Sequence, residues 1–512
     1  MGGAPITEGH MERDEPEHLD VLIVGAGISG IGAAQALVTR LPEKRFAVLE
    51  AREAIGGTWD LFRYPGIRSD SDLTTFGYEF KPWTERKVIA GADRILAYLR
   101  EAVAEYGLEE FFRFRQRVLD AAWDGPSARW TVVAEDPATG QRTTRTCDWL
   151  FAAGGYYRYD RGHTPPIEGL ERFAGPVIHP QEWPDRLDMT GKRVVVIGSG
   201  STAVTIVPAL AGQGAHVTML QRTPTYVLSL ASEDRFAERL RRLLGDRRAH
   251  ALLRRRSIAI QRTLWVLAKR RPAMVRRFIR SVNVRQLPEG YPVDEHFNPP
   301  YDPWDQRLCF VPDGDLFRAI RDGGAEVVTA RIRRIVEHGI ELEDGRALEA
   351  DVLVTATGLE VQPFGGFPMT VDGAPVRLSD TVAYKGLMLS GVPNFAFAIG
   401  YTNASWTLKV GLVCEYFVRL LDHMDRHGYA AAVPRLPAGG MPTRPLLDFG
   451  AGYIQRALDR LPKQGPAVPW STSTNYADDV RLLRRGPIAD RYLIFTAHEG
   501  RVPDTAEAAT AS

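Results

Sequence analysis

The chain has 512 residues, of which 44% are hydrophobic and 25% charged, a composition typical of globular proteins and not of disordered or fibrous chains. Its 64 basic and 63 acidic residues give a net charge of +1, which argues against a nucleic-acid partner for the chain as a whole. The three cysteines, Cys147, Cys309 and Cys414, are far apart, so the sequence predicts no disulfide framework, redox pair or metal site, and favours a cytoplasmic location.

Residues 20–30, DVLIVGAGISG, predict a buried strand, a tight turn and the start of a helix. In this pattern Gly25 permits the turn, Gly27 lets the backbone approach a pyrophosphate, and Gly30 packs the helix against the strand. The next strand, FAVLEAR, ends in Glu50, where an acid binds ribose hydroxyls. A surface carboxylate is the alternative for Glu50, but the whole unit favours a dinucleotide site.

The segment after this unit, residues 56–72, has the sequence GGTWDLFRYPGIRSDSD. Gly57 allows the backbone to lie against a flat ring, and Trp59 is an aromatic side chain that either stacks on a cofactor or packs in the core. Two further glycine-containing segments, residues 151–157 and 351–358, each predict a strand that ends in small residues. We expect both to lie against a cofactor where the chain passes between domains.

A second nucleotide-binding unit begins at Lys192, with the sequence KRVVVIGSGSTAVTIVPALAGQGAHVTMLQRTP. Its glycine pattern is Gly198-x-Gly200-x-x-Ala203, and its second strand closes on Arg222 and Thr223 in place of an acid. An arginine fork and a hydroxyl can grip a 2′-phosphate that a carboxylate would repel. The second site therefore predicts NADP(H) and the first FAD, with a solvated strand-end charge as the alternative for Arg222.

Residues 235–285 carry dense arginine interleaved with leucine, isoleucine, tryptophan and phenylalanine. This pattern predicts two or more amphipathic helices inserted into the second nucleotide domain. An arginine-rich solvent face is the favoured interpretation, and weak peripheral association with an anionic membrane stays open.

Near the end, residues 400–417 predict a polar turn and a helix whose N-terminus faces the flavin. Residues 461–473 predict a loop that carries Trp470 as a lid.

The segment FAGPVIHPQEWP, residues 173–184, fits the pattern F-x-G-x-x-x-H-x-x-x-W-P. It resembles the fingerprint of type I Baeyer–Villiger flavin monooxygenases, which also lies between two dinucleotide motifs. The segments GGTWDLFRYPGIRSDSDL, NPPYDPWDQRLC, PDGDLFRAIR, AYKGLMLSGVPN, GYTNASWTLK and LPKQG extend the resemblance over residues 18–490, most closely to the ethionamide-activating group of that family. The resemblance implies that His179 is a linker residue that relays domain movement as NADP repositions, not a general base.

The same resemblance implies roles for individual residues. Arg307 matches the catalytic arginine, and Asp70 matches the carboxylate that positions this arginine beside the flavin. Residues implied or predicted to bind the cofactors are Gly25, Gly27, Ser29, Gly30, Glu50, Gly57, Thr58, Trp59, Asp60, Leu61, Asp70 and Val118 for FAD, and Arg68, Ser69, Asp70, Gly198, Ser199, Gly200, Ser201, Thr202, Ala203, Val204, Arg222 and Thr223 for NADP(H). Many relatives carry a lysine directly before the catalytic arginine, whereas this chain has Gln306. The ethionamide-activating group also has glutamine at this position.

The predicted fold class is α/β, with two Rossmann-like dinucleotide-binding domains and a helical insertion. The predicted limits are 18–157 and 389–500 for the FAD domain, 158–228 and 305–388 for the NADP domain, 229–304 for the insertion, and 1–17 and 501–512 for flexible tails.

The implied activity is NADPH- and O2-dependent conversion of ketones to esters or lactones through a C4a-peroxyflavin, with oxidation of sulfur compounds beside it. A flavin N- or S-monooxygenase is the main alternative, and a non-catalytic membrane-associated flavin sensor is a remote one. A disulfide reductase would need a redox cysteine pair that the sequence lacks. The predicted partners are a small ketone or sulfur substrate and O2, without nucleic acid; the oligomeric state stays open.

Overall fold

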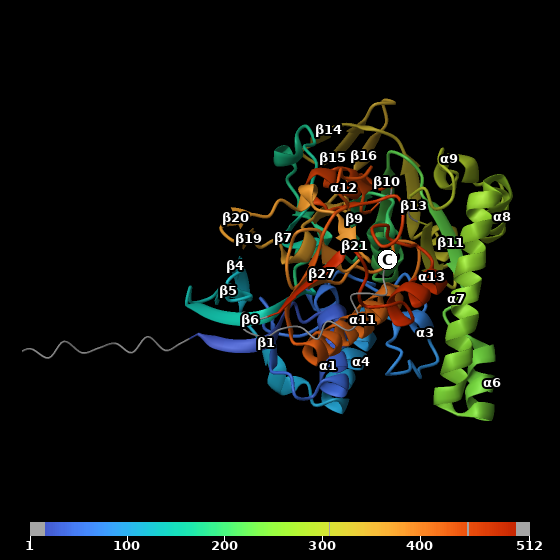
Figure 1. Ribbon diagram of the computed structural model, residues 1–512. Helices are drawn as coiled ribbons and strands as arrows, with labels where there is room; N and C mark the ends of the chain where they lie inside the picture. Colours follow the sequence, from blue (N-terminus) through green and yellow to red (C-terminus); the bar gives the residue numbers. More distant parts are fainter. Residues whose placement is uncertain (1–15, 307, 448–449, 498–512) are drawn as a thin grey trace, which may run out of the picture.

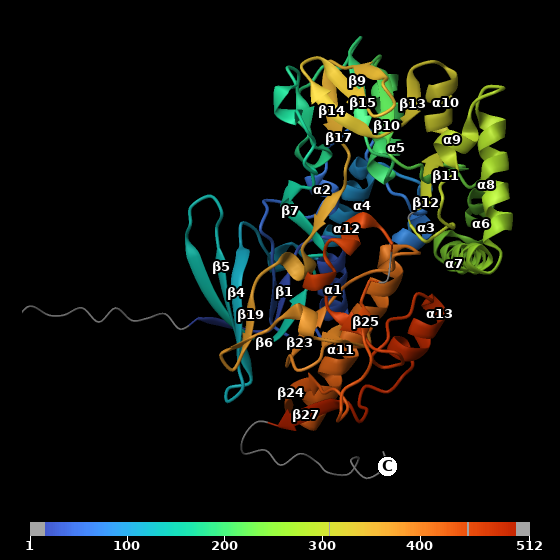
Figure 2. The ribbon, with the colours of Figure 1, turned by 90° about the horizontal axis from the view of Figure 1, so that it is seen from above.

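The computed structural model describes residues 16–306, 308–447 and 450–497. Two β-sheets with helices packed on them make up most of the molecule, and a helical part stands at one side (Figures 1 and 2). The predicted flexible tails fall almost wholly outside the described residues. Glu17, assigned to the first tail, is instead the first residue of strand β1 (Glu17–Val24).

The first sheet is built around β1 and has nine strands, in the order β20-β19-β4-β5-β6-β1-β2-β3 with β23 paired to β6. β1 pairs in parallel with both β2 and β6, so the carboxyl ends of these strands meet at one edge of the sheet. Leu22 and Ile23 in β1 are fully buried, as the apolar run predicts. The other strands are β2 (Phe46–Leu49), β3 (Phe112–Arg113), β4 (Arg117–Asp124), β5 (Arg129–Glu135), β6 (Arg142–Ala152), β19 (Met369–Val371), β20 (Ala374–Pro375) and β23 (Phe395–Phe397).

Three long helices share a core with this sheet: α1 (Ile28–Arg40), α4 (Ala92–Glu105) and α11 (Trp406–His427). Ile31, Leu99 and Val413, one from each helix, belong to one buried cluster with residues of β1 and β6. α11 comes from the C-terminal part of the chain and packs along α1. The first nucleotide unit is thus completed by sequence that lies almost four hundred residues away, as the predicted discontinuous domain requires.

The second sheet is entirely parallel, with the order β13-β10-β9-β17-β8. Its strands are β8 (Val177–Ile178), β9 (Arg193–Ile197), β10 (His216–Gln221), β13 (Ala325–Thr329) and β17 (Val352–Thr355). Helices α5 (Ser201–Gly212) and α10 (Asp315–Arg321) pack on one another and contact β13. Because parallel strands need crossover connections, this sheet confirms the second βαβ unit that the sequence predicts.

Four helices lie in sequence between β11 (Tyr226–Leu230) and β12 (Leu308–Pro312), which pair in parallel. They are α6 (Arg235–Leu244), α7 (Asp246–Arg270), α8 (Pro272–Gln286) and α9 (Val293–Phe297). α6 packs on α7, and α7 on α8, at the side of the molecule (Figures 1 and 2). The helices predicted for residues 235–285 are therefore confirmed.

The remaining elements are short and connect or cover these parts. They are helices α2 (Thr58–Leu61), α3 (Leu73–Phe76), α12 (Gly452–Gln455) and α13 (Tyr476–Asp479), and strands β7 (Tyr157–Gly162), β14 (Ile332–Val336), β15 (Gly339–Leu342), β16 (Ala347–Glu349), β18 (Leu359–Val361), β21 (Ala383–Tyr384), β22 (Met388–Leu389), β24 (Tyr429–Pro434), β25 (Arg444–Pro445), β26 (Lys463–Gln464) and β27 (Leu493–Ala497). The predicted domain limits stay predictions. Strand pairing, however, joins β19 and β20 to β4 in the first sheet, although the predicted second domain runs to residue 388.

Trp470 does not form a lid, so that prediction is wrong. Its side chain is only 3% exposed, in the same buried cluster as β1 and α11. Its ring lies edge-on to Tyr384 and Tyr492, with centroids 5.4 and 5.7 Å away. Proline and glycine around it correctly predict irregular backbone, but apolar contact area holds the indole in the core.

We therefore expect Trp470→Ala to lower the melting temperature by several degrees, because deleting a buried indole costs about 3–5 kcal/mol. Trp470→Phe should restore most of the loss, since a ring still fills part of the space. Thermal unfolding followed by circular dichroism measures both variants. An unchanged melting temperature with a raised KM for substrate would contradict the core role and favour a lid.

Candidate active site and cofactor sites

The turn between β1 and α1 is tightly packed. Gly25 has φ +106°, and a Cβ there would lie 2.9 Å from the Ala153 carbonyl oxygen. A Cβ at Gly30 would overlap the Gly25 carbonyl oxygen. Gly27 is the N-cap of α1, and no side chain caps the helix in the structure as described. The first amides of α1 are thus left for an anion, which the positive end of the helix also favours.

A cavity of about 400 Å³ opens in front of this turn. Glu50, at the end of β2, is 5% exposed and lines it. The Ala26 amide donates to Glu50 Oε2 at 2.8 Å, and the Arg52 amide donates to Oε1 at 2.9 Å. Burial raises the pKa of Glu50, while these two amide bonds act in the opposite direction. Two fixed amides hold the carboxylate at the cavity wall, where it can accept from ribose hydroxyls.

Most residues predicted to bind FAD meet in this cavity. They are Gly25, Gly27, Ser29, Glu50, Gly57, Thr58, Trp59 and Val118. Gly30, Asp60 and Leu61 are not among its lining residues; Gly30 packs α1 on the turn, and the Asp60 carboxylate accepts from Arg52 Nη2 at 2.5 Å. Their roles as FAD contacts stay predictions.

The cavity also has walls that the sequence reading missed. Tyr159 lies against Gly57, and its hydroxyl is 3.1 Å from Thr58 Oγ1. Trp406, the first residue of α11, donates from Nε1 to Ser29 Oγ at 2.9 Å. The N-terminus of α11 therefore lies at this cavity, and its orientation toward the flavin stays a prediction. Tyr159 follows the glycine-rich segment 151–157, which was the available signal for it.

The second nucleotide turn repeats the geometry of the first. Gly198 has φ +138°, and a Cβ there would overlap the Ala356 carbonyl oxygen. Gly200 caps α5 without a side-chain bond, and no described atom lies within 4 Å of the place of its missing Cβ. Ser199 Oγ is 3.1 Å from the Thr223 carbonyl oxygen, which ties the turn to the end of β10. Arg222 is exposed beside it, where a 2′-phosphate could be gripped.

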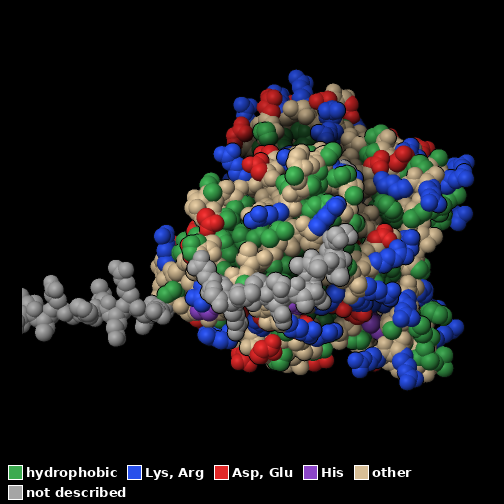
Figure 3. Space-filling view, viewed as in Figure 1, with side chains coloured by type: hydrophobic (Ala, Val, Ile, Leu, Met, Phe, Trp, Pro, Cys, Tyr) green, Lys and Arg blue, Asp and Glu red, His purple; other side chains and the backbone are tan. Residues whose placement is uncertain are grey.

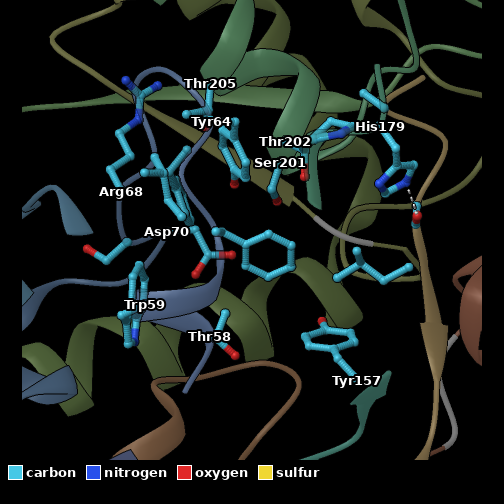
Figure 4. A pocket seen from close by; sticks show the side chains of 18 residues that line it. Thr58, Trp59, Tyr64, Arg68, Asp70, Tyr157, His179, Ser201, Thr202 and Thr205 are labelled. Atoms are coloured by element: carbon cyan, nitrogen blue, oxygen red, sulfur yellow. Dashed lines mark hydrogen bonds between the residues drawn. The ribbon is translucent and has the colours of Figure 1, made fainter. Parts of the chain in front are cut away.

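A smaller cavity of about 190 Å³ lies between the two units. Thr58, Trp59 and Tyr157 line both cavities, while Ser201 and Thr202 reach the smaller one from α5. Figure 4 shows the Asp70 carboxylate pointing into this space between the two groups. Ser69 also lines it, but Ala203 and Val204 are buried on the core side of α5. Some of the predicted NADP contacts therefore line the cavity, whereas Ala203 and Val204 pack α5 against the core.

Arg68 lies at the edge of this cavity and is already engaged. Its guanidinium donates to Asp315 at 2.5 Å from Nη1 and 3.3 Å from Nη2. Asp315 begins α10 of the second unit, so this forked ion pair joins the two units. Arg307, the predicted catalytic arginine, lies outside the described residues, and the proposed Asp70–Arg307 pair stays a prediction.

His179 is a wall residue with both ring nitrogens engaged. The Gln181 amide donates to Nδ1 at 3.1 Å, so the proton sits on Nε2, which donates to the Gly358 carbonyl at 3.1 Å (Figure 4). A Cβ at Gly162 would overlap the ring. Burial lowers the pKa of His179, against the bond to Gly358. The imidazole is neutral and is hydrogen-bonded through both ring nitrogens, between β7, β8 and the segment after β17. This arrangement fits a linker residue and not a general base.

Flavin-binding monooxygenase-like proteins match residues 87–373, more than half of the chain, and an NAD(P)-binding Rossmann-like domain matches residues 23–84. The chain belongs to the flavin-binding monooxygenase-like family. FAD-containing monooxygenase EthA of Mycobacterium tuberculosis strain H37Rv is 52% identical, with 94% of this chain and 98% of that protein covered. Probable FAD-binding monooxygenase AlmA of Acinetobacter baylyi is 46% identical, with 96% and 98% covered.

Solved structures show the same fold. Oxidized steroid monooxygenase bound to NADP has a TM-score of 0.73 and 22% identity, covering 94% of this chain and all of the other. OTEMO in complex with FAD and NADP has a TM-score of 0.68 at 22% identity, with 82% and 88% covered. The predicted fold class and family are therefore confirmed. The chain is a flavin monooxygenase, with cavities and uncapped helix N-termini that fit two dinucleotide cofactors.

We expect Gly27→Ala to lower the FAD content of the purified protein while the fold survives. The new Cβ would be 3.6 Å from Gly57 Cα, an ordinary contact, yet the methyl group occupies the path of the pyrophosphate. The matched variant Gly200→Ala should keep FAD and raise the KM for NADPH. Visible absorbance per protein and steady-state kinetics separate the two; equal FAD loss in both variants would contradict the assignment of the sites.

A pH-dependent contribution to stability is expected from His179. Because its pKa in the folded chain is lower than the usual 6.5, protonation favours the unfolded chain. The stabilisation is fully present above the usual pKa of 6.5 and is lost as the pH falls from 6.5 through the lower pKa of the folded chain. The gap in melting temperature between wild type and His179→Gln should thus be wider at about pH 7.5 than at about pH 5.5. The exposed His338→Gln serves as control, and an equal gap at both pH values would refute the point.

Proposed function

We propose that the chain is a Baeyer–Villiger monooxygenase, which converts ketones to esters or lactones with NADPH and O2 and also oxidises sulfur compounds. The observation that carries this proposal is the placement of Asp70 in the cavity where both nucleotide units meet. In the sequence resemblance this carboxylate positions the catalytic arginine, Arg307. The similarity to EthA and AlmA, and the fold shared with steroid and cyclohexanone monooxygenases, support it.

The cavity suits an apolar carbonyl compound. Trp59, Tyr64, Tyr157 and Phe310 line it, so aromatic surface lies beside the carboxyl group of Asp70 and the guanidinium of Arg68. Bound FAD would supply the redox chemistry of O2 activation when reduced by NADPH. Arg307 would stabilise negative charge that develops on the substrate oxygen, and Asp70 would hold the arginine in place. The aromatic walls would exclude water from this charge.

The NADPH site is proposed on the second turn. The amides at the start of α5 would bind the pyrophosphate, and Arg222 and Thr223 the 2′-phosphate. The exposed guanidinium of Arg222, beside a turn fixed by Ser199, supports NADPH over NADH. Gln306, where many relatives have lysine, reduces this preference without reversing it.

A flavin N- or S-monooxygenase would use both nucleotide sites in the same way and stays the alternative. It would not need the pair of Asp70 and Arg307. A cytoplasmic location is part of the proposal and is supported by the three cysteines, which form no disulfide. Weak association of residues 235–285 with membranes is part of it as well, supported by their exposed basic side chains. No described helix is long and apolar enough to cross a membrane.

We expect Arg307→Ala to abolish ester formation while NADPH still reduces the flavin. Asp70→Asn should lower ester yield by about 10- to 1000-fold, because an unpositioned cation stabilises the developing charge poorly. Both variants should release hydrogen peroxide in place of product. The exposed Arg172→Ala is the control. Aerobic NADPH oxidation with a ketone panel, scored for ester and peroxide, measures this, and sulfide or amine oxygenation that survives Arg307→Ala without any ester in wild type would favour the alternative.

A further inference from the structure

Positive charge is concentrated in the helices of the insertion. Residues 235–285 hold 17 of the 64 basic residues but only 2 of the 63 acidic ones, a net charge of +15 against −14 for the rest of the chain. The near-zero net charge of the whole therefore conceals a strongly polarised molecule. Such a field orients the protein toward a negatively charged partner.

Exposed apolar side chains gather on the same helices. Of the fourteen large hydrophobic residues that are exposed in the described structure, nine lie between residues 236 and 284: Phe236, Leu243, Leu244, Leu252, Ile260, Leu267, Met274, Phe278 and Val284. Leu243 is 80% exposed and Phe278 54%. Clustering of this kind marks an interaction surface, whereas single exposed residues do not.

The helical register places both kinds of side chain on the outer surface. In α7 the exposed residues Arg248, Arg255 and Arg262 recur every seven residues and form one stripe, with Leu252 within it. The opposite side of α7 is buried through Leu253 and Ala268 and other residues.

In α8, Met274 and Phe278 alternate with Arg277 and Arg285 on the exposed side. Figure 3 shows basic and hydrophobic side chains intermixed along the right-hand edge of the molecule, where Figure 1 places α6, α7 and α8. We call this exposed surface of the three helices the basic–apolar face.

We propose that the basic–apolar face docks on an anionic phospholipid membrane, with its arginines on the lipid phosphates and its leucine, phenylalanine and methionine side chains among the headgroups. This rests on the membrane association proposed for residues 235–285 and is independent of the oxygenation chemistry. Nucleic acid would bind the arginines but offers nothing to the interleaved aliphatic side chains. A second copy of the face would bring two surfaces of like charge together. An anionic bilayer is the partner that matches both components.

Flotation of the FAD-bound enzyme with vesicles tests the proposal. We expect binding to vesicles of mixed phosphatidylcholine and phosphatidylglycerol, little binding to phosphatidylcholine alone, and release by salt. The triple variant Arg248→Gln, Arg255→Gln and Arg262→Gln should bind about 100-fold more weakly, at about five-fold for each basic residue near the surface. Leu243→Ser with Phe278→Ser should lose about 10-fold or more, since inserted apolar area is removed.

Matched variants outside the face control for general effects of charge and hydrophobicity. Arg100→Gln, Arg172→Gln and Arg435→Gln remove three exposed arginines elsewhere, and Leu436→Ser with Val468→Ser removes two exposed apolar residues. All variants should retain NADPH oxidation with substrate, which separates docking from catalysis. Absence of binding to anionic vesicles by the active wild type, or equal losses in the control variants, would overturn the proposal, as would a loss caused by the arginine variant alone.

Discussion

Backbone-to-backbone contact at two glycine turns is the constraint on which the nucleotide sites depend. Gly25 lies against the carbonyl of Ala153, just after β6, and Gly198 lies against the carbonyl of Ala356, just after β17. In both units the strand beside the turn therefore ends in small residues. The contact leaves no room for a side chain, and it aims the first amides of α1 and α5 outward, where an anion is stabilised by the helix end.

Both an ion pair and an apolar contact join the two units, since the Tyr64 ring of the first packs against the core of the second. Arg68 in the first forms a forked ion pair with Asp315 in the second. Within the second unit, His179 bonds to the carbonyl of Gly358 and so ties the segment after β8 to the segment where the chain leaves β17. Polar contacts of this type can break and re-form without a loss of buried apolar area. The cavity that contains Asp70 lies between the two units, so a relative movement of the units would change its shape.

Much of this arrangement could be predicted from the sequence, because its constraints are local. A glycine at a fixed spacing after an apolar run specifies a turn, and Glu50 or Arg222 at the next strand end indicates the ribose chemistry. The contacts of Trp470 could not be predicted, because its partners Tyr384 and Tyr492 come from different segments and a proline-rich loop says nothing about them. Tyr159 and Asp315 were missed for the same reason. Each acts on a partner, Thr58 or Arg68, that is over a hundred residues away.

The helices of the insertion differ from the nucleotide units because much of their apolar surface is exposed. A globular helix needs one apolar side for the core, and α7 has that side in Leu253 and Ala268. Leu252 lies on its other side, in the stripe of Arg248, Arg255 and Arg262, and Ile260 is 52% exposed, so neither side chain is buried in that core. Periodicity alone shows a basic amphipathic helix, and only the burial of each residue separates the side that packs from the side that remains exposed. Because exposed apolar area costs free energy in water, its retention beside so much positive charge is best explained by a partner surface that is both anionic and apolar.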